Sequence, residues 1–70
     1  MITVFLPEIP GIVKQVSAAL DHEALYNPDF AGAEFVIGFD FYPWIDGADE
    51  IAGTYLLHSI INPIIETLGD

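Results

Sequence analysis

The sequence predicts a small single α/β (α+β) domain over residues 1–70, with the element order β-α-β-α. Three patterns predict this class: a β-branched and aromatic run near the N-terminus, a central segment of strict alternation, and two segments of helical spacing. A chain of 70 residues buries only about 60–65% of its unfolded surface, so its core is thin. We therefore expect two or three short strands with two helices packed on one face of the sheet.

The first strand is predicted over residues 2–6, where every residue is apolar or β-branched and a proline ends the run. The turn over residues 7–11 then leads into a helix. Apolar residues recur in that helix at helical spacing: Ile9, Ile12, Val13, Val16, Leu20 and Ala24. The helix should end near Leu25 or Tyr26, because Asn27 precedes a proline and is pushed out of the α region.

The strongest strand pattern covers residues 33–41, after a loop over residues 27–32. Side chains alternate there between two faces: Phe35, Ile37, Phe39 and Phe41 on one, and Glu34, Val36, Gly38 and Asp40 on the other. The phenylalanine face is predicted to pack on the core and the other face to meet water. Since two strands make a marginal sheet, a third strand is expected around residues 54–57 if that segment is not helical.

A second helix is predicted to start at Asp46, which is a good N-cap residue. Asp49 and Glu50 then lie in the first turn, where the helix dipole favours anions. The helix runs through the apolar segment 51–68, and Pro63 must kink or divide it because proline removes a backbone donor and clashes with the preceding turn. The segment is apolar over more than one stripe, so it is either central to the core or meets a partner.

The charge of the chain excludes several classes of protein. It carries 11 Asp and Glu against one basic residue, Lys14, giving a net charge of −10. This count excludes a direct nucleic-acid binder and a polybasic membrane anchor. The 53% apolar content excludes a disordered acidic tail. No secretory signal or bilayer-length apolar stretch occurs and there is no cysteine, so we expect a soluble cytoplasmic protein.

The sequence predicts no catalytic, cofactor or metal site. The acids of residues 46–50 miss the ligand spacing of an EF-hand loop. The two histidines, His22 and His58, are far apart in the sequence, and no cysteine accompanies them. Ser59 directly follows His58, a spacing at which two side chains do not meet on a helix. No nucleophile elbow and no glycine-rich phosphate motif occurs, so we do not expect an enzyme.

Acidic and aromatic residues gather in one part of the chain. Six of the 11 acids lie in residues 29–50, and five of the aromatic residues lie in residues 35–44. Tyr42 and Trp44 flank a proline at the strand end, where they either cap the core or stand exposed as interface anchors. The predicted partner-binding residues are therefore Asp29, Glu34, Asp40, Tyr42, Trp44, Asp46, Asp49 and Glu50.

An anionic face on a rigid domain can occupy a groove built for phosphates, because the lysines and arginines of the target then pair with carboxylates. Nucleic-acid-binding proteins are the commonest basic surfaces in a cell, so the expected partner is a basic nucleic-acid-binding protein or complex. We expect the chain to act on it as a monomer rather than a homodimer.

In size, charge, compactness and absence of catalytic motifs, the whole chain resembles the small phage-encoded anti-CRISPR proteins. That group has no common sequence motif, so no residue role is carried over from it. The resemblance implies a DNA mimic that binds a CRISPR effector complex in a bacterial host cell and blocks access of target DNA.

The alternative is a structural or assembly subunit. In this interpretation the apolar segment 51–68 docks into an oligomer through Leu57, Ile61, Ile64 and Leu68. Such an association should depend little on salt, whereas binding by a charge mimic should weaken steeply as salt rises. The salt dependence of partner binding therefore separates the two hypotheses.

Overall fold

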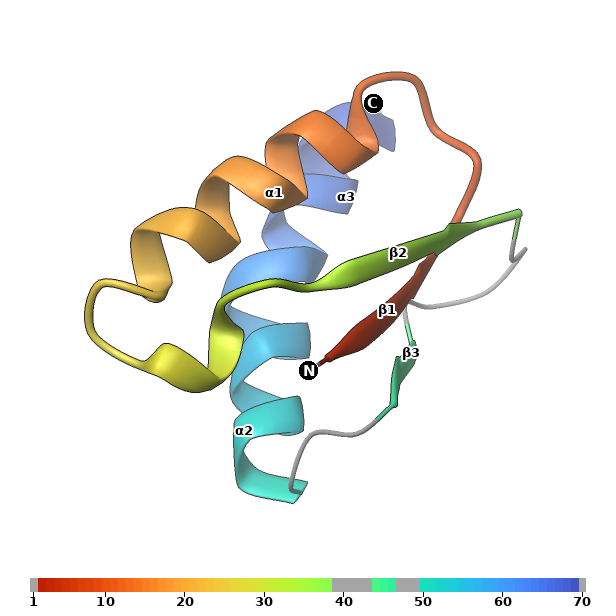
Figure 1. The fold of residues 1–70 in the computed structure, drawn as a ribbon. Helices are drawn as coiled ribbons and strands as arrows, with labels where there is room; N and C mark the ends of the chain where they lie inside the picture. Colours follow the sequence, from red (N-terminus) through yellow and green to blue (C-terminus); the bar gives the residue numbers. More distant parts are fainter. Residues whose placement is uncertain (1, 39–43, 47–49, 70) are drawn as a thin grey trace.

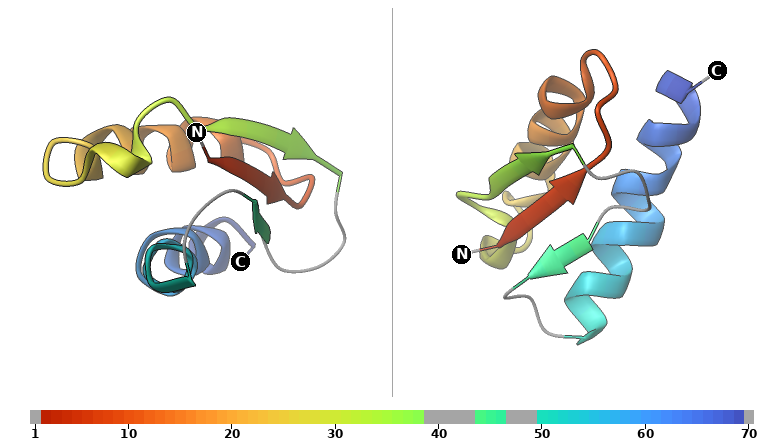
Figure 2. Two further views of the ribbon diagram at one scale, coloured as in Figure 1. Left: turned by 60° about the horizontal axis from the view of Figure 1, so that its bottom comes forward. Right: turned by 90° about the vertical axis from the view of Figure 1, so that its right-hand side faces the viewer.

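The computed structural model describes residues 2–38, 44–46 and 50–69, with only the backbone considered for 44–46 and 50–52. These residues form a sheet of three short strands with helices on one face, which confirms the predicted α+β class (Figure 1). The right-hand view of Figure 2 shows the C-terminal helical segment as one continuous column that lies beside the strands.

The central strand of the sheet is β1 (Thr3–Leu6). β2 (Glu34–Ile37) pairs parallel to it on one side, and β3 (Trp44–Asp46) pairs antiparallel to it on the other. Parallel neighbours need a crossover connection, which α1 (Ile12–Glu23) supplies. A third strand thus exists, as β3. Residues 54–57, where it was expected if they were not helical, are helical, because their apolar spacing continues that of the helix around them.

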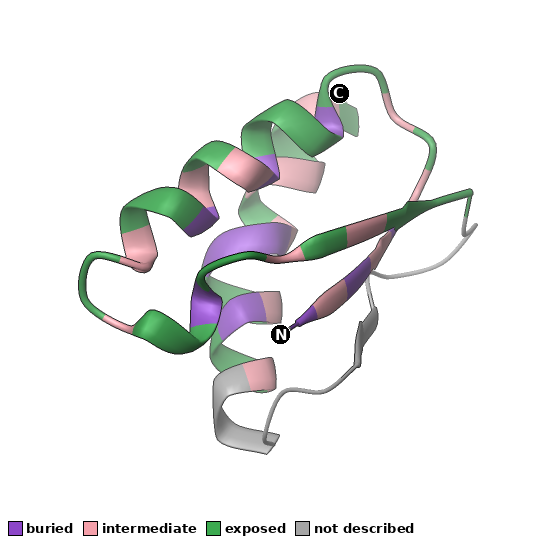
Figure 3. Ribbon diagram, in the orientation of Figure 1, coloured by how far each residue is buried: buried purple, intermediate pink, exposed green. Residues whose placement is uncertain are grey.

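One face of β1 forms the centre of the core. Ile2, Val4 and Leu6 are buried, whereas Thr3 and Phe5 are half-buried on the opposite face. Buried residues of the helices and of the loop complete one cluster: Ile12, Val16, Leu20, Phe30, Leu56, Ile60 and Ile61. Figure 3 marks these buried positions on β1, on one side of α1 and on the C-terminal helical segment. The helices thus cover the face of the sheet to which Val4 points.

α1 buries one stripe, as its spacing predicts, but it ends earlier than expected. It begins after Gly11, whose φ of 81° is a left-handed conformation that glycine adopts without strain. It ends at Glu23, because the N–H groups of Leu25 and Tyr26 bond to carbonyls three residues back and tighten the chain into a turn. Val13, predicted on the apolar face, is 38% exposed since it lies beside the buried stripe rather than within it.

The loop over residues 27–32 contains a short 3-10 helix, η1 (Pro28–Phe30). The side-chain oxygen of Asn27 caps it by accepting a hydrogen bond of 3.1 Å from the N–H of Asp29. This turn carries Phe30 into the core, where its ring stacks on that of Tyr55 with centroids 5.9 Å apart. The sequence pattern did not single out Phe30, because one aromatic residue in a polar loop has no periodicity.

β2 is an edge strand and is shorter than the predicted strand of residues 33–41. Phe35 packs against the core as predicted, and Glu34 and Val36 are exposed. Ile37, which the alternation predicts to be buried, is 42% exposed. The physical reason is its place at the sheet edge, near the end of a strand that runs out beyond the helical layer (Figure 1). Phe39 and Phe41 lie outside the described residues.

The predicted N-cap of the second helix was wrong. Asp46 is the last residue of β3, paired with Thr3, and α2 (Glu50–Tyr55) begins four residues later. Pairing with the central strand gives the backbone N–H and C=O groups of this segment hydrogen-bond partners. The segment up to Asp46 is therefore a strand and not the cap of a helix. Asp49 lies outside the described residues.

Pro63 divides the C-terminal helix by changing its winding. After α2 the chain forms a π-helix, η2 (Leu56–Ile61), and then α3 (Asn62–Gly69), with Pro63 at the second position of α3. The N–H of Asn62 bonds to the carbonyl of Leu57, five residues back. A proline ring clashes with the carbonyl four residues before it in an α-helix, and the wider π-turn relieves that clash.

Replacing Phe30 by alanine should lower the free energy of unfolding by about 3–5 kcal/mol, because it removes a buried ring from a thin core. Urea denaturation measures this change. Leu25→Ala is the control, since Leu25 is exposed and its truncation should change stability by less than about 0.5 kcal/mol. Equal losses in the two variants would contradict the assigned role of Phe30.

Candidate protein-binding surface

The topology brings several chain segments to one end of the domain. Because β1 and β2 are parallel, α1 must run back, and its last turn comes to lie near the first residues of both strands. η1 connects that turn to β2, while β3 runs antiparallel and finishes at the same end, where α2 begins. In Figure 1 the last turn of α1 and η1 lie at the lower left and the start of α2 lies at the bottom, away from the loop of residues 7–11 and from the C-terminus.

Six acidic residues belong to these segments, and we call this region the acidic end. Its members are Asp21 and Glu23 in the last turn of α1, Asp29 in η1, Glu34 at the start of β2, Asp46 at the end of β3, and Glu50 at the start of α2. The sole lysine of the sequence, Lys14, lies in the first half of α1, toward the opposite end. Among the described residues, no lysine or arginine therefore belongs to the acidic end.

Two of these acids flank the central strand in register. Thr3 pairs with Glu34 on one side and with Asp46 on the other. Residues paired across neighbouring strands share a face, so the three positions form one row on the face of the sheet opposite Val4. Two strand spacings set the α-carbons of Glu34 and Asp46 about 10 Å apart. The backbone thus fixes the separation of two acidic positions.

Glu23 also holds the acidic end together. The Tyr55 hydroxyl donates a hydrogen bond of 3.1 Å to Oε2 of Glu23, and the Tyr55 ring stacks on Phe30. The hydrogen bond and the negative charge of Glu23 raise the pKa of Tyr55 above 10, with a smaller contribution from burial. A raised tyrosine pKa means that this contact stabilises the fold below about pH 10, and that the effect is lost as pH rises through the folded value.

The carboxylates at this end are placed at a cost to stability. Asp21, Asp29 and Glu34 are exposed, and no ion pair with Lys14 forms within the described residues. Asp21 and Glu23 lie at the C-terminus of α1, where the helix dipole disfavours negative charge. Like charges that gather on a small domain also repel one another. The acidic end is therefore unfavourable for folding, which is a feature expected of a surface kept for binding.

The structure brings together only part of the predicted partner-binding set. Asp29 and Glu34 are exposed at the acidic end, and the backbone places Asp46 and Glu50 there. Trp44 lies in β3, in register with Phe5 on the central strand. The three other predicted residues fall outside the described part of the chain: Asp40, Tyr42 and Asp49.

Asp21 and Glu23 belong to this surface but were not among the predicted partner-binding residues. The predicted acids cluster along the chain within residues 29–50, and these two precede that range. The β-α-β crossover is the signal that points to them, because it returns the end of α1 to the start of the sheet.

The apolar C-terminal segment, the alternative docking surface, is largely used inside the domain. Ile61 is buried, and Ile64 and Leu68 pack against the core. Within residues 53–69, Tyr55 is the one large hydrophobic residue classed as exposed. An open groove between α1 and α3 remains, and it has no ionisable side chain among the residues that line it: Gln15, Pro63, Ile64, Thr67 and Leu68.

Further observations bear on chemistry and relatives. No three histidine, aspartate or glutamate side chains of the described residues gather as a metal-binding group. No helix in the described part of the chain is long and apolar enough to cross a bilayer. The chain matches no protein-family model, and comparisons with curated proteins and with solved structures found no match.

Replacing Asp21 by lysine should raise the free energy of unfolding by about 0.3–1 kcal/mol at low ionic strength. The new cation would interact favourably with the C-terminus of α1, and one repelling charge would be removed. Urea denaturation at several salt concentrations should show the gain shrinking as salt rises. The control is Glu8→Lys, which changes the net charge by the same amount in the loop before α1. An equal gain in the free energy of unfolding in that variant would contradict the claim that charge repulsion at the acidic end lowers stability.

Proposed function

We propose that this protein is a small inhibitor that uses its acidic end to bind the basic nucleic-acid-binding surface of a protein machine, and that the machine is a CRISPR effector complex. The observation that carries the proposal is the gathering of six acidic residues from five segments at one end, away from Lys14. The choice of a CRISPR effector follows from the resemblance of the chain to anti-CRISPR proteins in size, charge and compactness.

Binding of this kind works by replacement of phosphates. A groove that binds DNA presents lysine and arginine side chains, and carboxylates of the acidic end would pair with them in place of the DNA backbone. The net charge of −10 would steer the chain toward such a groove and make its association fast at low salt. Target DNA would then be excluded because its binding surface is occupied, with no covalent step.

The acidic positions are held on structured segments, which favours binding. Glu34 and Asp46 lie on strands paired to β1, and Asp29 lies in a turn capped by Asn27. Glu23 is held by its hydrogen bond to Tyr55. Groups fixed in advance lose less conformational entropy when they bind than groups on a flexible tail. This distinguishes a folded acidic domain from a disordered acidic segment of the same charge.

Reversing two charges at the acidic end should weaken binding by about tenfold or more at moderate salt. The variant is Asp29→Lys with Glu34→Lys, both at exposed positions. Its affinity should be compared with that of the wild type by surface-immobilised binding to purified, guide-loaded CRISPR effector complexes over a salt series. The variant should also restore cleavage of target DNA by the effector.

The matched control is Glu8→Lys with Glu66→Lys, which changes the net charge by the same amount at exposed positions outside the acidic end. This control should bind within a few-fold of the wild type. Equal weakening in both pairs would show that overall charge, rather than the acidic end, drives the interaction. Wild-type protein that binds none of the effector complexes would overturn the proposed target.

A further inference from the structure

Two large hydrophobic residues stand almost fully in solvent beside the acidic end. Leu25 is 77% exposed and Tyr26 is 76% exposed, in the turn between α1 and η1. The other exposed large hydrophobics among the described residues are only 38–45% exposed. Scattered single hydrophobics on a surface are ordinary, but two adjacent hydrophobic residues that are both about three-quarters exposed need another explanation.

The turn that carries this pair is held rigidly. The N–H of Leu25 bonds to the carbonyl of His22 at 3.2 Å, and the N–H of Tyr26 bonds to that of Glu23 at 2.9 Å. The N–H of Asn27 bonds to the same Glu23 carbonyl, also at 2.9 Å. The His22 and Tyr26 rings meet edge to face with centroids 5.8 Å apart, which limits the positions open to the tyrosine ring. The pair is thus presented in an ordered conformation.

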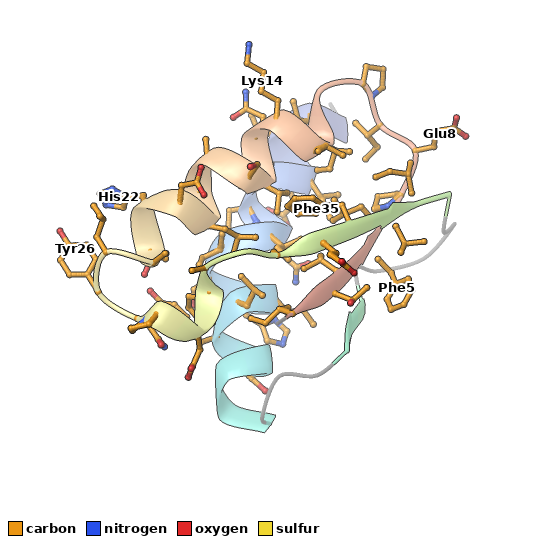
Figure 4. All side chains as sticks on the ribbon, in the orientation of Figure 1. Phe5, Glu8, Lys14, His22, Tyr26 and Phe35 are labelled. Carbon is orange, nitrogen blue, oxygen red and sulfur yellow. The ribbon has the colours of Figure 1, made fainter. Side chains whose placement is uncertain are left out.

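The pair is also bordered by carboxylates. Asp21 and Glu23 precede it in the last turn of α1, and Asp29 follows it in η1. Figure 4 shows the side chains of His22 and Tyr26 projecting from the end of α1 that lies away from Lys14 and Glu8. An apolar centre with a polar, charged rim is the arrangement of a protein-binding hot spot.

We propose that Leu25 and Tyr26 are the apolar anchors of the interface, and that they enter a pocket of the effector complex whose walls are apolar and whose rim carries lysine and arginine. This inference rests on the proposed function and adds the site at which affinity is concentrated. The rim cations would pair with the carboxylates around the turn, and a guanidinium could lie against the exposed face of the Tyr26 ring.

The charge of the turn argues for this occupant over others. A second copy of the chain would bring Asp21, Glu23 and Asp29 against the same three carboxylates. A bilayer with anionic headgroups would repel the same rim. A basic protein surface would interact favourably with both the apolar centre of the turn and its acidic border.

The test uses Leu25→Ser and Tyr26→Ser in the full chain, with binding measured on the effector complexes used for the charge variants. Each substitution should weaken binding by about tenfold or more, mostly through faster dissociation. Thermal midpoints should match the wild type, because both side chains are exposed. Val13→Ser is the control, a partly exposed hydrophobic in the first half of α1 whose loss should leave binding unchanged.

The outcomes separate the two proposals. Serine variants that bind like the wild type, while the Asp29 and Glu34 reversal abolishes binding, would overturn the anchors and leave the proposed function standing. A wild type that binds no effector complex would overturn both. A dimer seen by analytical ultracentrifugation that Leu25→Ser dissolves would assign the turn to a second copy and also overturn this inference.

Discussion

The parallel pairing of β1 with β2 is the constraint on which the rest of the structure depends. Parallel strands cannot be joined by a tight turn, so the chain between them must travel the length of the sheet and return. α1 makes that return, burying Ile12, Val16 and Leu20 against the strand that precedes it. The same return carries the end of α1 and the turn after it to the edge where both strands begin. The acidic end is a direct consequence of this topology.

Charge and stability oppose each other at that end. The fold places Asp21 at the C-terminus of α1, where the helix dipole disfavours negative charge, and gathers further carboxylates at the same end, where like charges repel. Glu23 is held by a hydrogen bond from the hydroxyl of Tyr55, and the Tyr55 ring in turn stacks on Phe30. A sequence selected for stability alone would mix lysine and arginine among these acids. The cost is understandable if the surface meets a basic partner.

Much of the fold could be predicted from the sequence, because periodic patterns report burial. The β-branched and aromatic run of residues 2–6 predicted β1, and the helical spacing of apolar residues such as Val16 and Leu20 predicted α1. Features without a period were missed: Phe30 reaches the core from a loop, and Asp46 ends a strand of three residues rather than capping a helix.

The candidate surface, too, could be predicted only in part from the sequence. Asp29 and Glu34 were found because they lie near other acids in the sequence. Asp21 and Glu23 join them only through the crossover. Hydrogen–deuterium exchange should be measured on the free chain and on the chain bound to a guide-loaded CRISPR effector complex. Binding should slow exchange across residues 21–30 and at the start of β2. Exchange should be unchanged across residues 8–16 and 62–69, and protection confined to those two segments would contradict the acidic end as the binding surface.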